Sequence, residues 1–231
     1  MIADKLARVH ERIASACASA ARPVESVTLL VVSKTFGPDA VRAAHSEGET
    51  RFGENYVQEG LEKILSLSEL RDRIEWHLIG PLQSNKTRVV AEQFDWVHAI
   101  DRLKLAERLS AQRPASLPPL DVCLQVNISG EGSKSGLAPR DAIETALAVA
   151  ALPRLNLRGL MSIPEPADDF EAQRRPHRAL RELFESLQAE GLPLDTLSMG
   201  MSADLEAAIA EGSTLVRVGS AIFGERPRPA G

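Results

Sequence analysis

The sequence is poor in cysteine, with only Cys17 and Cys123 among its 231 residues. These two cysteines have neither the pattern of a disulfide framework nor the spacing of metal ligands. No pair of histidines or carboxylates stands at ligand spacing either. We therefore expect no disulfide scaffold and no metal site, and the composition fits the reducing cytoplasm.

Long apolar runs and an excess of basic residues are also missing. No apolar run is long enough to span a bilayer, and residues 1–21 carry charges throughout, unlike a signal peptide. The chain has 27 basic and 32 acidic residues, a net charge of −5, and its basic residues are scattered. These features argue against a membrane or nucleic-acid partner and predict a soluble, cytoplasmic protein.

The chain does have a regular alternation of short apolar runs with segments of helical periodicity. The expected strands are residues 28–33, 50–52, 75–79, 96–100, 121–127, 156–161, 196–199 and 215–219, of which the second and seventh are weak. The expected helices are residues 39–47, 56–65, 86–93, 103–111, 139–152, 176–190 and 203–211. Eight such units predict an α/β fold, a (β/α)8 TIM barrel, and no Gly-x-Gly-x-x-Gly follows a strand to suggest a dinucleotide fold.

We expect this barrel to be a single domain over residues 1–231. An additional N-terminal helix is expected within residues 1–26, because Ile2, Leu6, Val9 and Ile13 fall on one helical face. Residues 225–231 are expected to form a flexible tail, and residues 164–175 the longest loop at the rim.

Lys34 is the lone cation at the end of the most strand-like run, residues 28–33. Functional residues of a barrel lie at the carboxyl ends of its strands, so Lys34 would lie at the mouth. An amine held near a second cation is less easily protonated and can form a Schiff base with a carbonyl. A solvated lysine is the ordinary alternative, and Lys86 and Lys134 are rival amines.

The ends of strands seven and eight have the chemistry of a phosphate site, which barrels often build there. Gly200 and Gly219 let backbone amides approach an anion closely, while Ser202 and Ser220 add hydroxyls. Ser202 is also expected to cap the helix that begins at residue 203. Ordinary turn and cap residues are the alternative, but the two loops together favour an anion site.

Arg217 and His77 are the other candidates within strands. Arg217 alternates with Val216 and Val218, so either the arginine or the valines point into the barrel. A buried guanidinium needs a partner, and Glu54 is one candidate for an ion pair. His77 has the alternative of a hydrogen-bonded core histidine.

Several long motifs run through nearly the whole chain in one order. They are VSKT at 32–35, FGENYVQE at 52–59, WHLIGPLQSNK at 76–86, GLM at 159–161, LSMGMSAD at 197–204 and RVGSAIFG at 217–224. With these motifs the chain resembles the pyridoxal phosphate homeostasis proteins, the YggS/PROSC-type family.

The resemblance implies a barrel like the N-terminal domain of alanine racemases that binds pyridoxal 5'-phosphate (PLP) as a covalent aldimine on Lys34. It further implies that Ser202, Gly219 and Ser220 bind the phosphate and that Arg217 faces the pyridine nitrogen. Asn55, His77 and Met199 would help to line the pocket. The family role would be intracellular PLP (vitamin B6) homeostasis by a monomer, with transient contact to apo PLP enzymes.

Catalysis on PLP needs an electron sink and a placed proton donor or acceptor. An arginine facing the ring nitrogen makes the ring a weak sink, and the single tyrosine, Tyr56, belongs to the FGENYVQE motif. Racemases of this barrel type also add a C-terminal β domain, which we do not expect here. The sequence thus favours holding and delivery of PLP without turnover, with a small racemase-like enzyme or a Schiff-base aldolase as alternatives.

Overall fold

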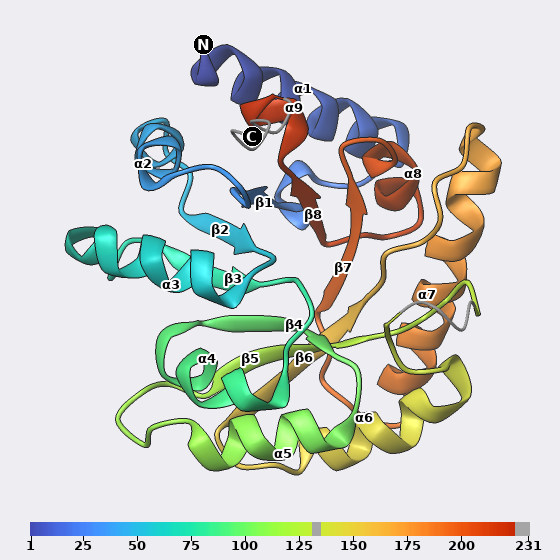
Figure 1. The fold of residues 1–231 in the computed structure, drawn as a ribbon. Coiled ribbons are helices and arrows are strands. Elements are labelled where there is room, and N and C mark those ends of the chain that lie inside the picture. The colour runs from blue at the N-terminus through green and yellow to red at the C-terminus, as the bar shows by residue number, and fades with distance from the viewer. Residues whose placement is uncertain (131–134, 225–231) are drawn as a thin grey trace, which may run out of the picture.

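The computed structural model describes residues 1–130 and 135–224, in which eight parallel strands close into a barrel (Figure 1). The strands follow one another in sequence order, and the eighth pairs with the first. They are β1 Thr28–Val32, β2 Arg51–Glu54, β3 Glu75–Leu78, β4 Trp96–Ile100, β5 Leu120–Gln125, β6 Leu155–Met161, β7 Thr196–Met201 and β8 Leu215–Val218. The predicted barrel is confirmed, including its two weakest strands.

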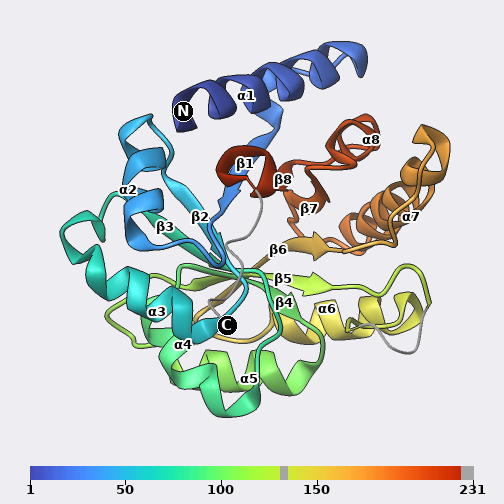
Figure 2. The same ribbon diagram turned by 45° about the horizontal axis from the view of Figure 1, so that its top comes forward.

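Helices form a ring around the barrel (Figure 2). They are α2 Pro38–Ser46, α3 Val57–Ser66, α4 Thr87–Gln93, α5 Leu103–Gln112, α6 Ala142–Ala150, α7 Phe170–Ala189, α8 Leu205–Ala210 and α9 Ser220–Phe223. In β1, Leu30 packs inside the barrel with Ile79 and Leu215, whereas Val31 belongs to the apolar layer between strands and helices. Alternate residues of one buried strand therefore fill two separate cores.

The predicted N-terminal helix is confirmed as α1, Ile2–Ser19, which packs outside the ring against α8 and α9 (Figure 1). Its buried residues are Leu6, Val9, Ile13, Ala16 and Cys17. The predicted tail, residues 225–231, lies outside the described residues. Within the described ranges, no helix is both long enough and apolar enough to cross a membrane.

The expected start of α7 was wrong. The helix begins at Phe170, because the Asp169 side chain caps it by accepting a hydrogen bond from the Ala172 amide at 2.8 Å. Pro176, which was expected in the first turn, lies inside the helix. The rim loop predicted over residues 164–175 is accordingly shorter, since its second half is helical.

Candidate functional site

A cavity of about 280 Å³ opens at the carboxyl ends of the strands. Its lining residues are Val32, Lys34, Phe36, Asn55, Ile79, Ile163, Met201, Ser202, Ala203, Arg217, Gly219, Ser220 and Gly224. Six of the eight predicted site residues are therefore brought together from the ends of β1, β2, β7 and β8. Its volume is close to the lower end of the range for small-molecule sites.

Lys34 is half-buried and lines this cavity two residues after β1. The chain turns sharply here, because the Phe36 amide donates to the Ser33 carbonyl at 3.1 Å. Thr35 adopts a φ of 67°, a left-handed conformation that is costly for a residue other than glycine. Its amide donates to the Glu59 side chain at 2.9 Å, and this bond helps to hold the turn that places Lys34.

A buried polar cluster supports the same strand end. Lys63 on α3 donates to Glu54 Oε1 at 2.6 Å and to the Ser33 carbonyl at 2.7 Å. The Ser33 hydroxyl donates to the same Glu54 oxygen at 2.5 Å. Burial raises the pKa of Glu54, although the Lys63 ammonium opposes this change. Glu54 is therefore the partner of Lys63, and the alternative of an ion pair between Glu54 and Arg217 is wrong.

Arg217 points into the barrel, while Val216 and Val218 face the helices. Its Nη1 donates to the Ser198 carbonyl at 2.6 Å and to Ser198 Oγ at 2.8 Å, and its Nη2 donates to the Ser162 carbonyl at 2.8 Å. Burial lowers the pKa of the guanidinium to about 10, against the opposing influence of Asp204. The group thus carries a positive charge into the cavity at neutral pH.

The loops after β7 and β8 meet at one edge of the cavity. The Ser202 and Ser220 hydroxyls lie 3.2 Å apart, and Arg12 of α1 donates to the Ser202 carbonyl at 2.9 Å. A Cβ on Gly219 would come within 2.7 Å of the Val32 carbonyl oxygen, so the backbone itself closes this edge. Ser202 does not cap α8 as predicted, because the helix starts at Leu205 and Asp204 occupies the N-cap.

Asn55 follows β2 and presents a buried acceptor to the cavity. Among the described residues, its side-chain oxygen is one of the few buried polar atoms without a hydrogen-bond partner. The Asn55 backbone is fixed by close packing, since a Cβ on Gly80 would come within 2.0 Å of the Asn55 carbonyl oxygen. The side chain is thus held beside the cavity with one acceptor left for a ligand or solvent.

The structure does not bring His77 or Met199 to this cavity. Met199 is fully buried in the layer between strands and helices, because the inward position of β7 is taken by its neighbour Ser198. His77 lies inside the barrel but lines a separate pocket at the amino ends of the strands, with Arg51 and Trp96. The expectation that these two residues line the main pocket is therefore wrong.

The rival amines are not part of the cavity either. Lys86 is exposed at the start of α4 and is absent from the lining. Lys134 lies outside the described residues. Within the part of the chain that the structure describes, no group of three or more histidine, cysteine or acidic side chains is placed to hold a metal ion.

The chain is similar to known proteins over nearly its whole length. The family model for the alanine racemase N-terminal domain matches residues 5–227. A pyridoxal phosphate homeostasis protein of Pseudomonas aeruginosa is 58% identical over 225 residues, which cover 97% of this chain and 96% of the relative. The protein of the same name from Escherichia coli is 54% identical over 226 residues, 97% of each chain. The chain belongs to the family of pyridoxal phosphate homeostasis proteins.

A solved structure extends this family relationship to three dimensions. PipY of Synechococcus elongatus, determined with PLP bound, superimposes with a TM-score of 0.85 at 36% identity. The match covers 97% of this chain and all of PipY. The predicted membership of the homeostasis-protein family and the predicted fold are both confirmed.

Sequence reasoning about this family member missed two groups of site residues. The apolar lining, which includes Phe36, Ile79 and Ile163, was overlooked because these residues look like ordinary core positions in sequence. Lys63 was also missed, although it lies beside Gly60 and Ile64 on the buried face of α3. A lysine on the apolar stripe of a helix was the available signal for a buried ion pair.

Proposed function

We propose that this protein binds PLP at the barrel mouth and takes part in intracellular PLP homeostasis by holding and releasing it. The observation that carries the proposal is one cavity lined by an amine, a guanidinium and two hydroxyls, from Lys34, Arg217, Ser202 and Ser220. The names of the full-length relatives and the PLP-bound structure of PipY support it.

The phosphate of PLP is assigned to the edge formed by Ser202, Gly219 and Ser220. Hydroxyls 3.2 Å apart can donate to neighbouring oxygens of one phosphate group. Gly219 lines the same edge, and its lack of a Cβ lets the end of β8 pack against Val32 so that this edge can form. This donor set suits a dianionic group better than a neutral one.

Lys34 is assigned as the covalent attachment point, through a Schiff base. It is the only primary amine among the described lining residues of the cavity, and the turn at Thr35 fixes its place at the end of β1. When bound, PLP supplies an aldehyde that condenses with amines and an aromatic ring that withdraws electrons. Ile79 and Ile163 give that ring an apolar surface.

Arg217 is assigned to the pyridine nitrogen, and Asn55 to a place beside the bound molecule. Arginine has donors and no acceptor, and it does not readily give up a proton near neutral pH. A ring nitrogen beside it therefore stays unprotonated. The free acceptor on Asn55 is satisfied if the bound molecule or its hydration shell presents a donor.

Storage and release fit this site better than turnover. The described lining holds only two ionisable side chains, Lys34 and Arg217, and each already has a role in binding. Tyr56, the single tyrosine of the chain, is 56% exposed and does not line the cavity. We therefore propose delivery of PLP to apo PLP enzymes through transient contacts, by a protein that does not process amino acids itself.

Spectroscopic titration with PLP and with pyridoxal tests the phosphate assignment. Ser202→Asp should weaken PLP binding by at least ~10-fold, because it adds a negative charge and removes a donor. Binding of pyridoxal, which lacks the phosphate, should stay the same. Ser68→Asp, the same change at an exposed serine away from the cavity, is the control. Equal losses for both ligands would sink the assignment.

Deuterium exchange at the α-carbon of amino acids tests the absence of turnover. The PLP-loaded protein is incubated with each amino acid in heavy water and exchange is followed by NMR. We expect exchange no faster than with free PLP. Exchange that is much faster, and that disappears in Lys34→Ala, would favour the racemase-like alternative.

A further inference from the structure

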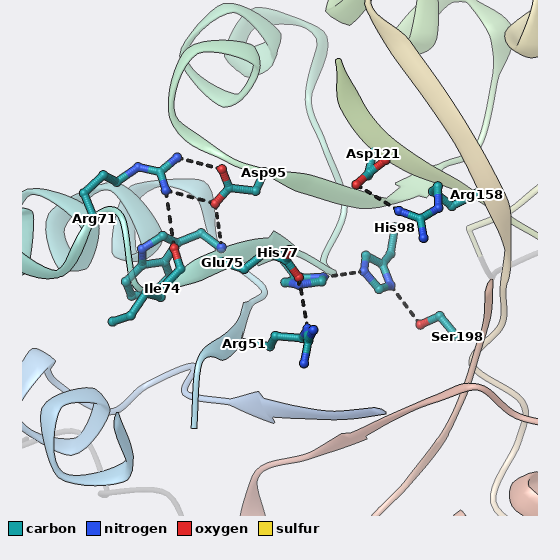
Figure 3. Close-up of polar contacts among 11 residues, drawn as sticks. Arg51, Arg71, Ile74, Glu75, His77, Asp95, His98, Asp121, Arg158 and Ser198 are labelled. Carbon is teal, nitrogen blue, oxygen red and sulfur yellow. Dashed lines mark hydrogen bonds and ion pairs between the residues drawn. The ribbon is translucent and has the colours of Figure 1, made fainter. Parts of the chain in front are cut away.

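A continuous chain of hydrogen bonds crosses the interior of the barrel from Glu75 to Arg217. Glu75 Oε1 lies 2.9 Å from His77 Nε2, and His77 Nδ1 lies 2.9 Å from His98 Nε2 (Figure 3). His98 Nδ1 lies 2.8 Å from Ser198 Oγ, which accepts from Arg217 Nη1 at 2.8 Å. The chain joins the amino end of the barrel to the side chain that reaches the cavity.

The middle of this chain is sealed from solvent. His77, His98 and Ser198 are all 0% exposed. Since β4 and β7 are not neighbours in the sheet, the contact between His98 and Ser198 spans the barrel interior. The ring of His77 also stacks on Trp96, with centroids 5.1 Å apart and planes inclined by 14°. These side chains therefore have little freedom to form other bonds.

The chemistry of the two ends gives the chain one direction. Glu75 bonds as a carboxylate acceptor, so His77 must carry its proton on Nε2 and accept at Nδ1 if the ring is neutral. His98 must then donate from Nε2 and accept at Nδ1, and the Ser198 hydroxyl must donate to it. Arg217 can only donate, which matches the remaining acceptor site on Ser198 Oγ. In each of these hydrogen bonds the donor therefore lies on the Arg217 side and the acceptor on the Glu75 side.

The charges around the chain agree with neutral histidines. Burial lowers the pKa of both His77 and His98, and the nearby Arg217 charge lowers that of His98 further. Burial acts against ionisation of Glu75, but the bond from His77 and the charge of Arg51 outweigh it and lower the pKa of this carboxyl. A cation at the cavity and a carboxylate at the far end thus favour the same orientation of the dipoles.

We propose that Ser198, His98 and His77 are positioning residues that hold Arg217 in place at the cavity through this chain. The inference rests on the proposed PLP function for its ligand, but the hydrogen-bond chain is already present in the protein without ligand. Ser198 presents the hydroxyl acceptor to Arg217, and His98 fixes the direction of that hydroxyl. His77 fixes the tautomer of His98, and Glu75 accepts the last hydrogen bond of the chain.

Nitrogen-15 NMR of the histidine rings tests the chain in the protein without ligand. At pH 7.5 we expect His77 and His98 to be neutral and protonated on Nε2 only. A proton on Nδ1 of either ring, alone or together with one on Nε2, would overturn the proposed direction. This measurement does not depend on PLP binding, so it still decides the chain if the proposed function fails.

Ser198→Ala tests whether the chain positions Arg217. We expect a population of the Nδ1-protonated tautomer of His98, a shift in the ring-nitrogen resonance of bound ¹⁵N-labelled PLP, and about ten-fold weaker PLP binding, as for the loss of one hydrogen bond to a charged group. Ser213→Ala is the control, since it removes a buried hydroxyl that bonds only backbone carbonyls.

The two variants also separate positioning from general loss of stability. If Ser198→Ala and Ser213→Ala change PLP binding and the PLP resonance equally, the positioning role is wrong. If Ser198→Ala fails to fold, the histidine tautomers of the unaltered protein still decide the direction of the chain. If the unaltered protein binds no PLP, the proposed function is overturned while the tautomer result stands.

Discussion

Single residues close the edge of the cavity where the phosphate is assigned. At Gly219 an added Cβ would meet the Val32 carbonyl oxygen at 2.7 Å and the Val32 Cβ at 3.2 Å. The first of these is a backbone atom of β1, which cannot move without disturbing the strand that leads to Lys34. The glycine is therefore required by the close approach of two backbones.

Gly219→Ala should lower the free energy of unfolding by about 1–3 kcal/mol, because an overpacked backbone contact must be relieved. It should also weaken PLP binding, since β1 and β8 separate at the cavity. Urea unfolding and PLP titration measure the two effects. Gly37→Ala is the control, because nothing lies within 4 Å of its Cβ position, and it should cost less than about 1 kcal/mol. Equal costs for both variants would contradict this explanation.

At this scale the sequence predicted the cavity residues that follow strands, and Arg217 within β8, but it misplaced His77 and Met199 within β3 and β7. The positions of the strand ends were enough to predict that Lys34, Ser202 and Ser220 lie at the cavity. Predicting the position of His77 requires the stagger of the strands in the barrel. Its pairing with Trp96 at the start of β4 places it near the amino end. That stagger is a property of strand pairing and leaves no mark in one strand's own sequence.

Between elements, a cluster of buried polar side chains near the site consists of Ser33, Glu54 and Lys63. It joins the end of β1, the end of β2 and the middle of α3. Both charged side chains are almost fully buried, at 0% for Glu54 and 5% for Lys63. A buried pair of this kind stabilises little by itself, but the loss of one partner leaves an uncompensated charge.

Lys63→Met should therefore lower the free energy of unfolding by about 3–5 kcal/mol. The double variant Lys63→Met with Glu54→Gln should recover much of that loss, because the remaining amide is neutral and still accepts from Ser33. Urea unfolding of the two variants and of Glu54→Gln alone gives the interaction free energy between the Lys63 and Glu54 side chains. A loss below about 1 kcal/mol for Lys63→Met would show that the pair is not buried as described.

Element boundaries were predicted well where punctuation is simple and poorly at α7. A proline near a helix start is typical, and this placed the expected start at Pro176. The structure instead starts the helix at Phe170, where the Asp169 cap and the acidic Glu171 in the first turn provide the signal. A proline is tolerated farther along the helix, and the sequence alone gave no means to rank it against the cap.

The whole barrel separates two environments along its axis. The mouth holds the proposed PLP site, whereas the amino end holds ion pairs such as Arg158 with Asp121 and Asp195. The fully buried side chains of His77 and His98 lie between them. The alternation of strands and helices predicted the closed barrel, but it could not predict that polar side chains from four strands would meet inside it.

Stability of the whole molecule should depend on pH through His77 and His98. Burial lowers the pKa of both below the ordinary value of 6.5, so the unfolded chain binds protons that the folded barrel does not. Unfolding then takes up protons. The free energy of unfolding therefore has its full value above pH 6.5 and declines as the pH falls below it. Between pH 7.5 and 5.5 we expect a loss of up to ~3 kcal/mol, at no more than ~1.4 kcal/mol per histidine and pH unit.

Urea unfolding at several pH values across this range measures how steeply the free energy of unfolding changes with pH. Glu75 and Asp204, whose pKa values are lowered from the ordinary 4.5 and 3.8, lose their stabilising contribution only at lower pH. The variant His98→Gln should lose about half of the slope, since one of the two rings with a lowered pKa is gone. A free energy of unfolding that stays constant from pH 7.5 to 5.5 would contradict the neutral, buried state of these histidines.

Borohydride reduction followed by peptide mass mapping tests whether Lys34 holds PLP, as we propose. The protein is loaded with PLP, the imine bond is reduced to a stable amine, and the modified lysine is located by mass. We expect a single adduct on Lys34, which disappears in Lys34→Ala. An adduct on Lys86 or Lys134 in place of Lys34, or none at all, would contradict it.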